Sequence, residues 1–119
     1  MGINEESVNV PWKVTPDKIR AVIERIIEIS APRKLILFGS SARGDVHRDS
    51  DLDVMVVTSD DIENARKESI RIRRALKGLR MPMDILVVTE SKLRELGDAP
   101  GLIYREAIRY GKVVYERHT

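Results

Sequence analysis

The hydrophobic residues of the chain follow two spacings that alternate along it. From Thr15 onward they recur three and four residues apart, which is the spacing of one buried face of a helix. The members of this face are Ile19, Val22, Ile23, Ile26 and Ile27. Thr15 suits an N-cap, Pro16 suits the first helical position, and Pro32 should end the helix. The pattern predicts a first helix between Thr15 and Pro32.

Short apolar runs and a second helical pattern follow. Residues 35–38 and 52–57 are continuous apolar runs, which are typical of buried strands. From Asp60 to about Leu79 the apolar residues again alternate three and four apart, so a second helix is predicted there. Residues 83–88 form a third apolar run. In chain order the sequence therefore predicts two strands before this long helix and a third strand after it.

The C-terminal part predicts two more helices and an edge strand. A short helix is expected at 91–96, and a last helix from about 100 to 110, capped by Asp98. Gly111 follows at a position where a helix end favours a positive φ. Residues 113–115 can then add an edge strand. We predict an α/β (α+β) fold, in which a mixed β-sheet is flanked by helices.

Length and composition narrow the class of protein. The 119 residues can form one core but cannot hold a catalytic domain and a separate substrate domain, so we expect a single domain over 1–119 with an N-terminal extension over 1–14. Cysteine is absent, which excludes thiolate metal sites and fits a reducing cytoplasm. No apolar run approaches the roughly 20 residues that cross a bilayer, and the N-terminus lacks the blocks of a signal peptide. We expect a soluble cytoplasmic protein with no membrane partner.

The charge is nearly balanced, since 21 basic and 19 acidic residues give a net charge of +2. Such a balance does not favour a dedicated nucleic-acid binder. Basic residues nevertheless gather on the predicted helix face 66–80: Arg66, Lys67, Arg71, Arg73, Arg74, Lys77 and Arg80. We interpret this face as solvated and partly paired with Glu63 and Glu68. A role in binding a partner or RNA stays open.

The segment from residue 35 to 57 carries the strongest indication of chemistry. Asp51 and Asp53 are two residues apart at the start of an apolar strand, so both project from the same face of it. Neighbouring carboxylates repel each other, and an apolar setting adds the cost of lost hydration. A positive charge between them is therefore expected, and a divalent metal ion is the simplest candidate.

A third carboxylate should join this pair. If the first two strands are antiparallel, the end of the first lies beside the start of the second. A helical crossover makes the second and third strands parallel, so their starting ends coincide and Asp84 lands beside Asp51 and Asp53. Three carboxylates suit one or two Mg²⁺ ions, which prefer oxygen ligands and leave places for phosphate oxygens.

The turn after the first strand is suited to bind phosphate. Gly39 lets the backbone come close to a ligand, and residues 40–43 can begin a short helix whose free N–H groups attract anions. Ser40 adds a hydroxyl donor, Arg43 lies beside the turn, and Gly44 can close it. The segment lacks the Gly-Lys-Ser/Thr ending of a P-loop and the three glycines of a dinucleotide fold.

In this order the motifs resemble the nucleotidyltransferase superfamily of the DNA polymerase β type. The resemblance is closest to its minimal members, the MNT proteins, whose pattern GSxARGxxxxxSDxDxxV matches residues 39–56. It implies ATP or another nucleoside triphosphate as donor, one or two Mg²⁺ ions held by Asp51 and Asp53, and Asp84 as third ligand or as base for the acceptor hydroxyl. The residues it implies at the nucleotide are Gly39, Ser40, Ser41, Arg43, Gly44 and Ser50.

The resemblance also implies a partner. Larger relatives carry a further helical domain that holds the base and the acceptor, and 119 residues leave no room for one. In the minimal family the partner is often a separate helical HEPN protein, an RNase toxin that the MNT chain neutralises by transferring AMP to a tyrosine. Alternatives are a non-catalytic antitoxin that acts by binding, or transfer to a small molecule or an RNA end. The oligomer could contain one kind of chain or both.

Four aromatic residues have no place in these motifs. Tyr104, Tyr110 and Tyr115 are expected to pack against the sheet, although an exposed tyrosine could itself accept a nucleotide. Trp12 is expected to pack onto the domain from the N-terminal extension. None of the four is needed for the proposed metal and phosphate site.

Overall fold

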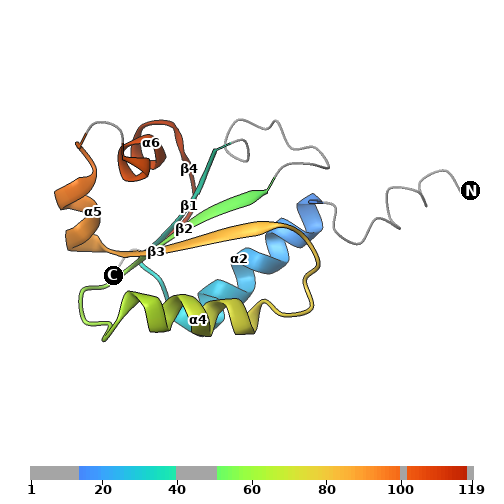
Figure 1. Cartoon of the computed structure of the whole chain (residues 1–119). Coiled ribbons are helices and arrows are strands. Elements are labelled where there is room, and N and C mark those ends of the chain that lie inside the picture. The colour runs from blue at the N-terminus through green and yellow to red at the C-terminus, as the bar shows by residue number, and fades with distance from the viewer. Residues whose placement is uncertain (1–13, 40–50, 100–101, 118–119) are drawn as a thin grey trace, which may run out of the picture.

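The computed structural model describes residues 14–39, 51–99 and 102–117 (Figure 1). Its helices are α2 (Pro16–Ser30), α4 (Ala65–Ala75), α5 (Glu90–Leu96) and α6 (Ile103–Tyr110). Its strands are β1 (Lys34–Phe38), β2 (Leu52–Thr58), β3 (Met83–Thr89) and β4 (Lys112–Glu116). None of the described helices combines the length and the hydrophobicity that a membrane span requires.

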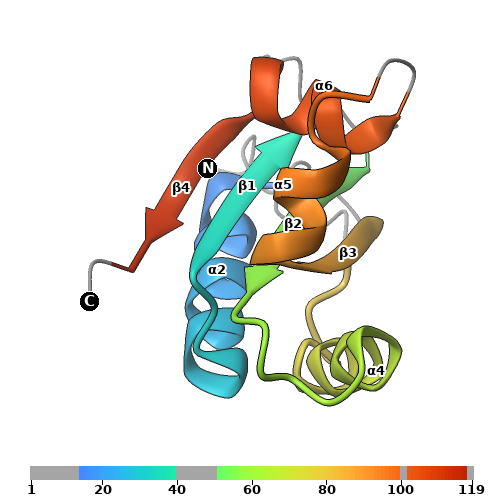
Figure 2. The same cartoon turned by 90° about the vertical axis from the view of Figure 1, so that its left-hand side faces the viewer.

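The four strands form one mixed sheet in the order β3-β2-β1-β4. Strand β1 is antiparallel to β2 and β4, whereas β2 and β3 are parallel. Helices α2 and α4 cover one face of the sheet, and α5 and α6 cover the other (Figures 1 and 2). The predicted α/β fold with a mixed sheet flanked by helices is confirmed.

The face under α2 and α4 holds the larger core. The Thr15 hydroxyl accepts a hydrogen bond from the Lys18 N–H at 3.2 Å, and α2 begins at Pro16 as predicted. Val22 and Ile26 of the predicted stripe are fully buried. They pack with strand and α4 residues that include Leu35, Leu37, Leu52, Val54, Val56, Ile72 and Ile85. Burial of this apolar surface stabilises the fold.

The opposite face holds a second, smaller core. It contains Ile36, Phe38, Met55, Val57 and Val88 from the strands, with Leu93 of α5 and Ala107 of α6. Side chains alternate between the two faces along a strand, so residues two positions apart lie on the same face. Asp53 precedes Met55 by two positions, and Asp84 precedes Leu86 by two positions. The fold thus assigns both acids to the face that α5 and α6 cover.

The second helix is shorter than predicted. It begins at Ala65 because the Asn64 side chain accepts hydrogen bonds from the N–H groups of Arg66 and Lys67, at 2.8 and 3.1 Å. Asp60, the expected start, instead accepts a hydrogen bond from the Ser91 N–H at 3.0 Å. That hydrogen bond lowers the pKa of the Asp60 carboxyl. Asp60 and Asn64 are both suitable helix caps, but Asp60 is hydrogen-bonded to α5 and Asn64 caps α4.

The prediction for the last helix is wrong at its start, whereas its end at Tyr110 is confirmed. The helix begins at Ile103, and its N-cap is Leu102 rather than Asp98. Gly111 has φ of −76°, not a positive value. Glycine is needed there for space, because a Cβ atom would lie 2.6 Å from Ile36 Cγ2. The end of α6 is therefore pressed against β1.

Candidate active site

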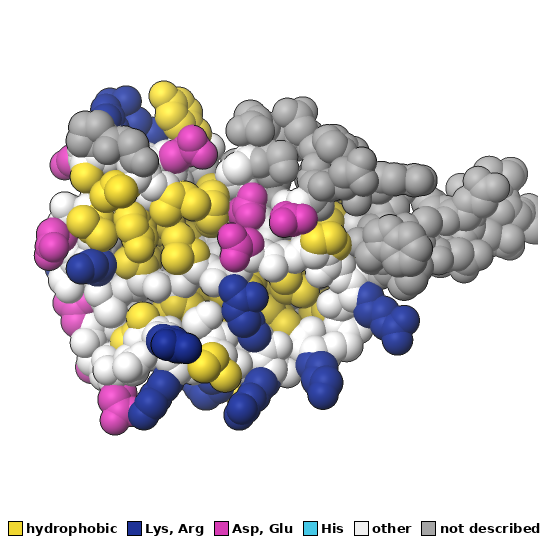
Figure 3. Space-filling model, viewed as in Figure 1, with side chains coloured by type: hydrophobic (Ala, Val, Ile, Leu, Met, Phe, Trp, Pro, Cys, Tyr) yellow, Lys and Arg dark blue, Asp and Glu magenta, His cyan; other side chains and the backbone are white. Residues whose placement is uncertain are grey.

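The structure brings two of the three predicted carboxylates together in the sheet. In the register Asp53 lies opposite Phe38 of β1 on one side and Asp84 of β3 on the other. Asp51 stands immediately before β2. The predicted convergence of the end of β1 with the starts of β2 and β3 is thus present. Figure 3 shows acidic side chains grouped beside an apolar area on this side of the molecule.

Asp53 is the electrostatic centre of the group. Partial burial raises the pKa of its carboxyl, and the negative charges of Asp84 and Asp51 raise it further. The ionised form therefore repels its neighbours and has lost part of its hydration. A divalent cation would relieve both costs, and carboxylate oxygens are the ligands that Mg²⁺ prefers. The donor set fits a magnesium ion.

Gly39 joins the turn to this carboxylate. Its φ is +66°, in the left-handed region that favours glycine. A Cβ atom at this position would lie 2.5 Å from Asp53 Oδ2. The sequence indicated that the backbone comes close to a ligand at Gly39; the structure shows a close approach to the Asp53 carboxylate. Any larger residue would displace the side chain at the centre of the site.

Asp84 has a cationic neighbour that the sequence did not reveal. Arg73 of α4 lies with its guanidinium 3.6 Å from Asp84 Oδ1 and donates a hydrogen bond to the Ile85 carbonyl at 3.2 Å. Helix α4 covers the opposite face, but β3 is an edge strand, so the long side chain reaches it at the edge. No three acidic or histidine side chains among the described residues are close enough to hold one metal ion.

The rest of the basic face on α4 is partly paired, as predicted. Glu68 forms an ion pair with Arg71 at 3.0 Å and accepts a hydrogen bond from the Ser30 hydroxyl at 2.5 Å. Burial alone would raise the pKa of Glu68, but the hydrogen bonds from Arg71 and Ser30 outweigh it, so the pKa is lowered. Glu63 and Lys67 pair at 3.7 Å on the exposed side. Of these contacts, the hydrogen bond between Ser30 and Glu68 joins α2 to α4.

The other predicted phosphate-binding residues are Ser40, Ser41, Arg43, Gly44 and Ser50, and they lie outside the described residues. Trp12 lies outside them as well. Of the tyrosines, Tyr104 and Tyr115 are partly buried against the two cores, as expected. Tyr110 is not, because 70% of its surface is exposed. Periodicity alone would place Tyr110 on the buried face, because it lies three residues after the buried Ala107, but Tyr110 is the last residue of the helix.

The candidate site thus consists of strand carboxylates beside a glycine turn with a left-handed backbone. The family model described as "Polymerase beta, Nucleotidyltransferase" matches residues 18–119. The chain therefore belongs to this family of nucleotidyltransferase domains. Comparison with curated proteins gives no match. The resemblance inferred from the motifs is confirmed at the level of the polymerase β type.

Solved structures share the fold. A candidate nucleotidyltransferase from Sulfolobus solfataricus has 18% identity and a TM-score of 0.59, with 85% of this chain and 79% of that chain covered. A toxin-antitoxin solved with AMP-PNP has 22% identity and a TM-score of 0.55, covering 88% and 76%. A mutant of the toxin-antitoxin MntA-HpeT has 20% identity and a TM-score of 0.49, covering 88% and 75%. The first two support the fold assignment.

Proposed function

We propose that the chain is a Mg²⁺-dependent nucleotidyltransferase that moves AMP from ATP to a hydroxyl acceptor. The observation that carries this proposal is the position of Asp53, between the Gly39 turn and Asp84, with a raised pKa caused by burial and by its acidic neighbours. Family membership supplies the reaction class. The cluster of negative charge at Asp53 would be offset by the Mg²⁺ that accompanies a nucleoside triphosphate.

In this proposal Asp51 and Asp53 hold one or two Mg²⁺ ions, and Asp84 is the base or, after its side chain turns toward them, the third ligand. The turn that begins at Gly39 binds the phosphates through its backbone N–H groups and Ser40. When bound, Mg²⁺ would lower the charge repulsion between the phosphates and an incoming oxygen. Fixing the donor in this way also orders the reacting groups, which itself lowers the barrier.

The reaction would be an in-line displacement. The acceptor oxygen forms a bond to the α-phosphorus, the bond from that phosphorus to the bridging oxygen breaks, and pyrophosphate leaves with the electron pair. The hydroxyl proton passes to an Asp84 carboxylate oxygen. Asp84 has to turn away from Arg73 to do this, and its side chain is 65% exposed, so the movement is open to it.

The acceptor we propose is a tyrosine of a helical HEPN RNase toxin, which would make this cytoplasmic chain its antitoxin. This choice follows the minimal family that the motif at 39–56 resembles. The similarity to a toxin-antitoxin solved with AMP-PNP agrees with it. A partner that brings its own hydroxyl would supply what the described domain does not provide, a platform for the acceptor.

The test is transfer of label from α-³²P-ATP in the presence of Mg²⁺, with and without the HEPN protein. We expect labelled partner and released pyrophosphate with the natural chain. Asp51→Asn with Asp53→Asn should lower the rate more than about a hundredfold, because the metal ligands are lost. Asp17→Asn is the matched control, since Asp17 is an exposed carboxylate on α2.

Three outcomes separate the candidate functions. Labelled partner that depends on Asp51 and Asp53 supports transfer to the toxin. A stable complex that silences the RNase without label would show the non-catalytic antitoxin instead. Equal labelling by the natural chain and the double variant contradicts the proposed site.

A further inference from the structure

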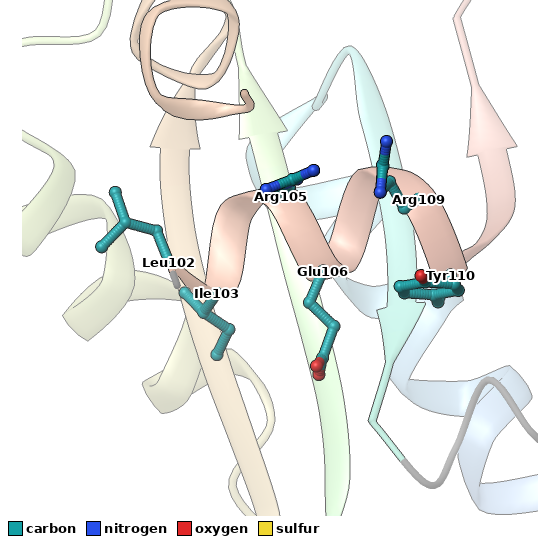
Figure 4. A pocket seen from close by; sticks show the side chains of 6 residues that line it. All are labelled: Leu102, Ile103, Arg105, Glu106, Arg109 and Tyr110. Carbon is teal, nitrogen blue, oxygen red and sulfur yellow. The ribbon is translucent and has the colours of Figure 1, made fainter. Parts of the chain in front are cut away.

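Helix α6 carries a pocket of about 530 Å³. This volume lies within the range of about 300–1,000 Å³ that is typical of small-molecule sites. The lining residues are Leu102, Ile103, Arg105, Glu106, Arg109 and Tyr110. Figure 4 shows Ile103, Glu106 and Tyr110 along one side of the helix, with Arg105 and Arg109 along the opposite side. The lining residues therefore lie on two opposite sides of α6, one apolar and acidic and the other basic.

The pocket lies at the end of the sheet that holds the carboxylates. Figures 1 and 2 both show α6 beside the end of β1, where the Gly39 turn begins. Lys112, two residues after Tyr110, lies opposite Leu37 in the sheet, and Leu37 lies opposite Val54. Two strand spacings give about 10 Å between the backbones of Lys112 and Val54. Val54 is the neighbour of Asp53, so a ribose and its base can span the distance from a phosphate at the carboxylates.

Tyr110 and Ile103 present apolar surface on this side of α6. Both are exposed, and 70% of the Tyr110 surface faces solvent. An aromatic ring held open on a helix next to a phosphate site is suited to stack on a nucleobase, which contributes about 1–3 kcal/mol per base. Ile103 lies two turns earlier on the same side and can cover the other edge of a planar ring.

Glu106 lies between these two residues along the helix. Its carboxylate disfavours a phosphate on this side of the pocket, because like charges repel. A ribose is neutral and offers hydroxyl donors, and acidic residues accept hydrogen bonds from ribose hydroxyls in dinucleotide-binding folds. The chemistry of this side therefore fits a nucleoside rather than the triphosphate.

We propose that the side of α6 formed by Ile103, Glu106 and Tyr110 binds the nucleoside of the donor nucleotide. The base stacks on the Tyr110 ring, and the Glu106 carboxylate accepts hydrogen bonds from the ribose hydroxyls. This inference rests on the proposed function, because it assumes that the phosphates of the same nucleotide lie at Asp51 and Asp53. According to this proposal, the side chains of α6 determine which nucleoside is bound.

Calorimetric titration with two ligands tests the role of Tyr110. The ligands are α,β-methylene ATP, whose α–β bond resists transfer, and inorganic tripolyphosphate, both with Mg²⁺. Tyr110→Ala should weaken binding of the methylene ATP about 5- to 150-fold and leave tripolyphosphate unchanged. Tyr110→Phe should retain both affinities. Ile108→Ala is the matched control, because Ile108 is 49% exposed on the same helix and does not line this pocket.

The role of Glu106 is tested with the 2′-deoxy form of the same analogue. The natural chain should bind the ribose form more tightly, and Glu106→Ala should reduce that ratio about 3- to 10-fold through the lost hydrogen bonds. An unchanged ratio overturns the assignment of Glu106.

The ligand pair also keeps the inference apart from the function on which it rests. Equal losses for both ligands in Tyr110→Ala, or no loss for the methylene ATP, overturn the assignment of the nucleoside to α6. Failure of the natural chain to bind either magnesium triphosphate contradicts the proposed function itself.

Discussion

The two faces of the sheet have different roles, although the same strands contribute side chains to both. In β2, Val54 and Val56 point to the face under α2 and α4, where they are fully buried. Asp53 belongs to the other face, and the same strand continues there with Met55 and Val57. One strand therefore contributes to the main core at every second residue and to the candidate active site at its start. Because side chains alternate along the seven residues of β2, Asp53 and the residues of the main core point to opposite faces of the sheet.

The helices that cover the two faces differ in length. Helices α2 and α4 have 15 and 11 residues, whereas α5 and α6 have 7 and 8. The shorter pair covers the second core and leaves Asp51 and Asp84 exposed at the sheet end. Exposed apolar side chains gather on this side as well, at Ile103, Ile108 and Tyr110.

The largest expected effect on stability is in the closed face. Ile26→Ala should lower the free energy of unfolding by about 2–5 kcal/mol, because Ile26 is fully buried under α2 and its removal leaves a cavity. Urea denaturation measures this loss. Ile70→Ala is the control, since Ile70 is exposed on α4 and should cost no more than about 0.5 kcal/mol. Equal losses in the two variants would show that the faces do not differ in this way.

Gly39→Ala is expected to damage both stability and the site. The left-handed backbone costs about 1–2 kcal/mol with a Cβ atom, and contact with Asp53 Oδ2 adds to this. Gly78→Ala is the matched control, because Gly78 has φ of +100° and no atoms near the position of its Cβ. In an Asp53→Ala background the extra loss of Gly39→Ala over Gly78→Ala should disappear. If it persists, the turn does not press on Asp53.

Glu68→Gln tests a contact that joins the two helices of the closed face. Removing the charge weakens the hydrogen bonds with Ser30 and Arg71, and about 1 kcal/mol of stability should be lost at pH 7. The pKa of Glu68 is lowered in the folded state, so its contribution is present above the unfolded pKa and disappears as the pH falls through the folded pKa. The difference between the variant and the natural chain should therefore vanish in acid. Glu63→Gln is the control, because Glu63 forms an exposed ion pair with Lys67, and this change should cost about 0.3 kcal/mol.

Asp53→Asn should have the smallest effect on stability, and in the opposite direction. At pH 7 without Mg²⁺ the change removes repulsion with Asp84 and Asp51, and we expect a gain below about 1 kcal/mol because water screens these charges. The folded pKa of Asp53 is raised, so its protonated form favours folding, and this contribution is lost as the pH rises from the unfolded pKa through the folded one. The gain from asparagine should thus disappear at low pH. A loss of stability at pH 7 would mean that the ionised carboxylate supports the fold.

The strands and the acidic residues could be predicted from the sequence because they follow from local rules. Alternation along 52–57 and the right-handed crossover were enough to bring Asp53 and Asp84 together. The start of α4 could not be predicted, since Asp60 and Asn64 are both suitable caps and only the distant Ser91 N–H decides between them.

Long-range contacts also account for the other differences. Arg73 meets Asp84 only because α4 lies along the edge strand β3. A Cβ atom at Gly111 would meet both the Ala107 carbonyl of α6 and Ile36 of β1, so glycine is required there for space rather than for a positive φ. Tyr110 was expected to pack against the sheet, but it lies at the end of α6 on the side that opens into the pocket. Each of these contacts depends on packing between elements far apart in the chain.

Manganese binding followed by electron paramagnetic resonance tests the role of Asp51 and Asp53 most directly. Mn²⁺ replaces Mg²⁺ in oxygen sites and reports its own binding. We predict that the natural chain binds Mn²⁺, that α,β-methylene ATP increases this affinity, and that Asp51→Asn with Asp53→Asn weakens it by at least about tenfold. The same Mn²⁺ affinity in the natural chain and in this double variant would contradict the assignment of the metal and triphosphate site.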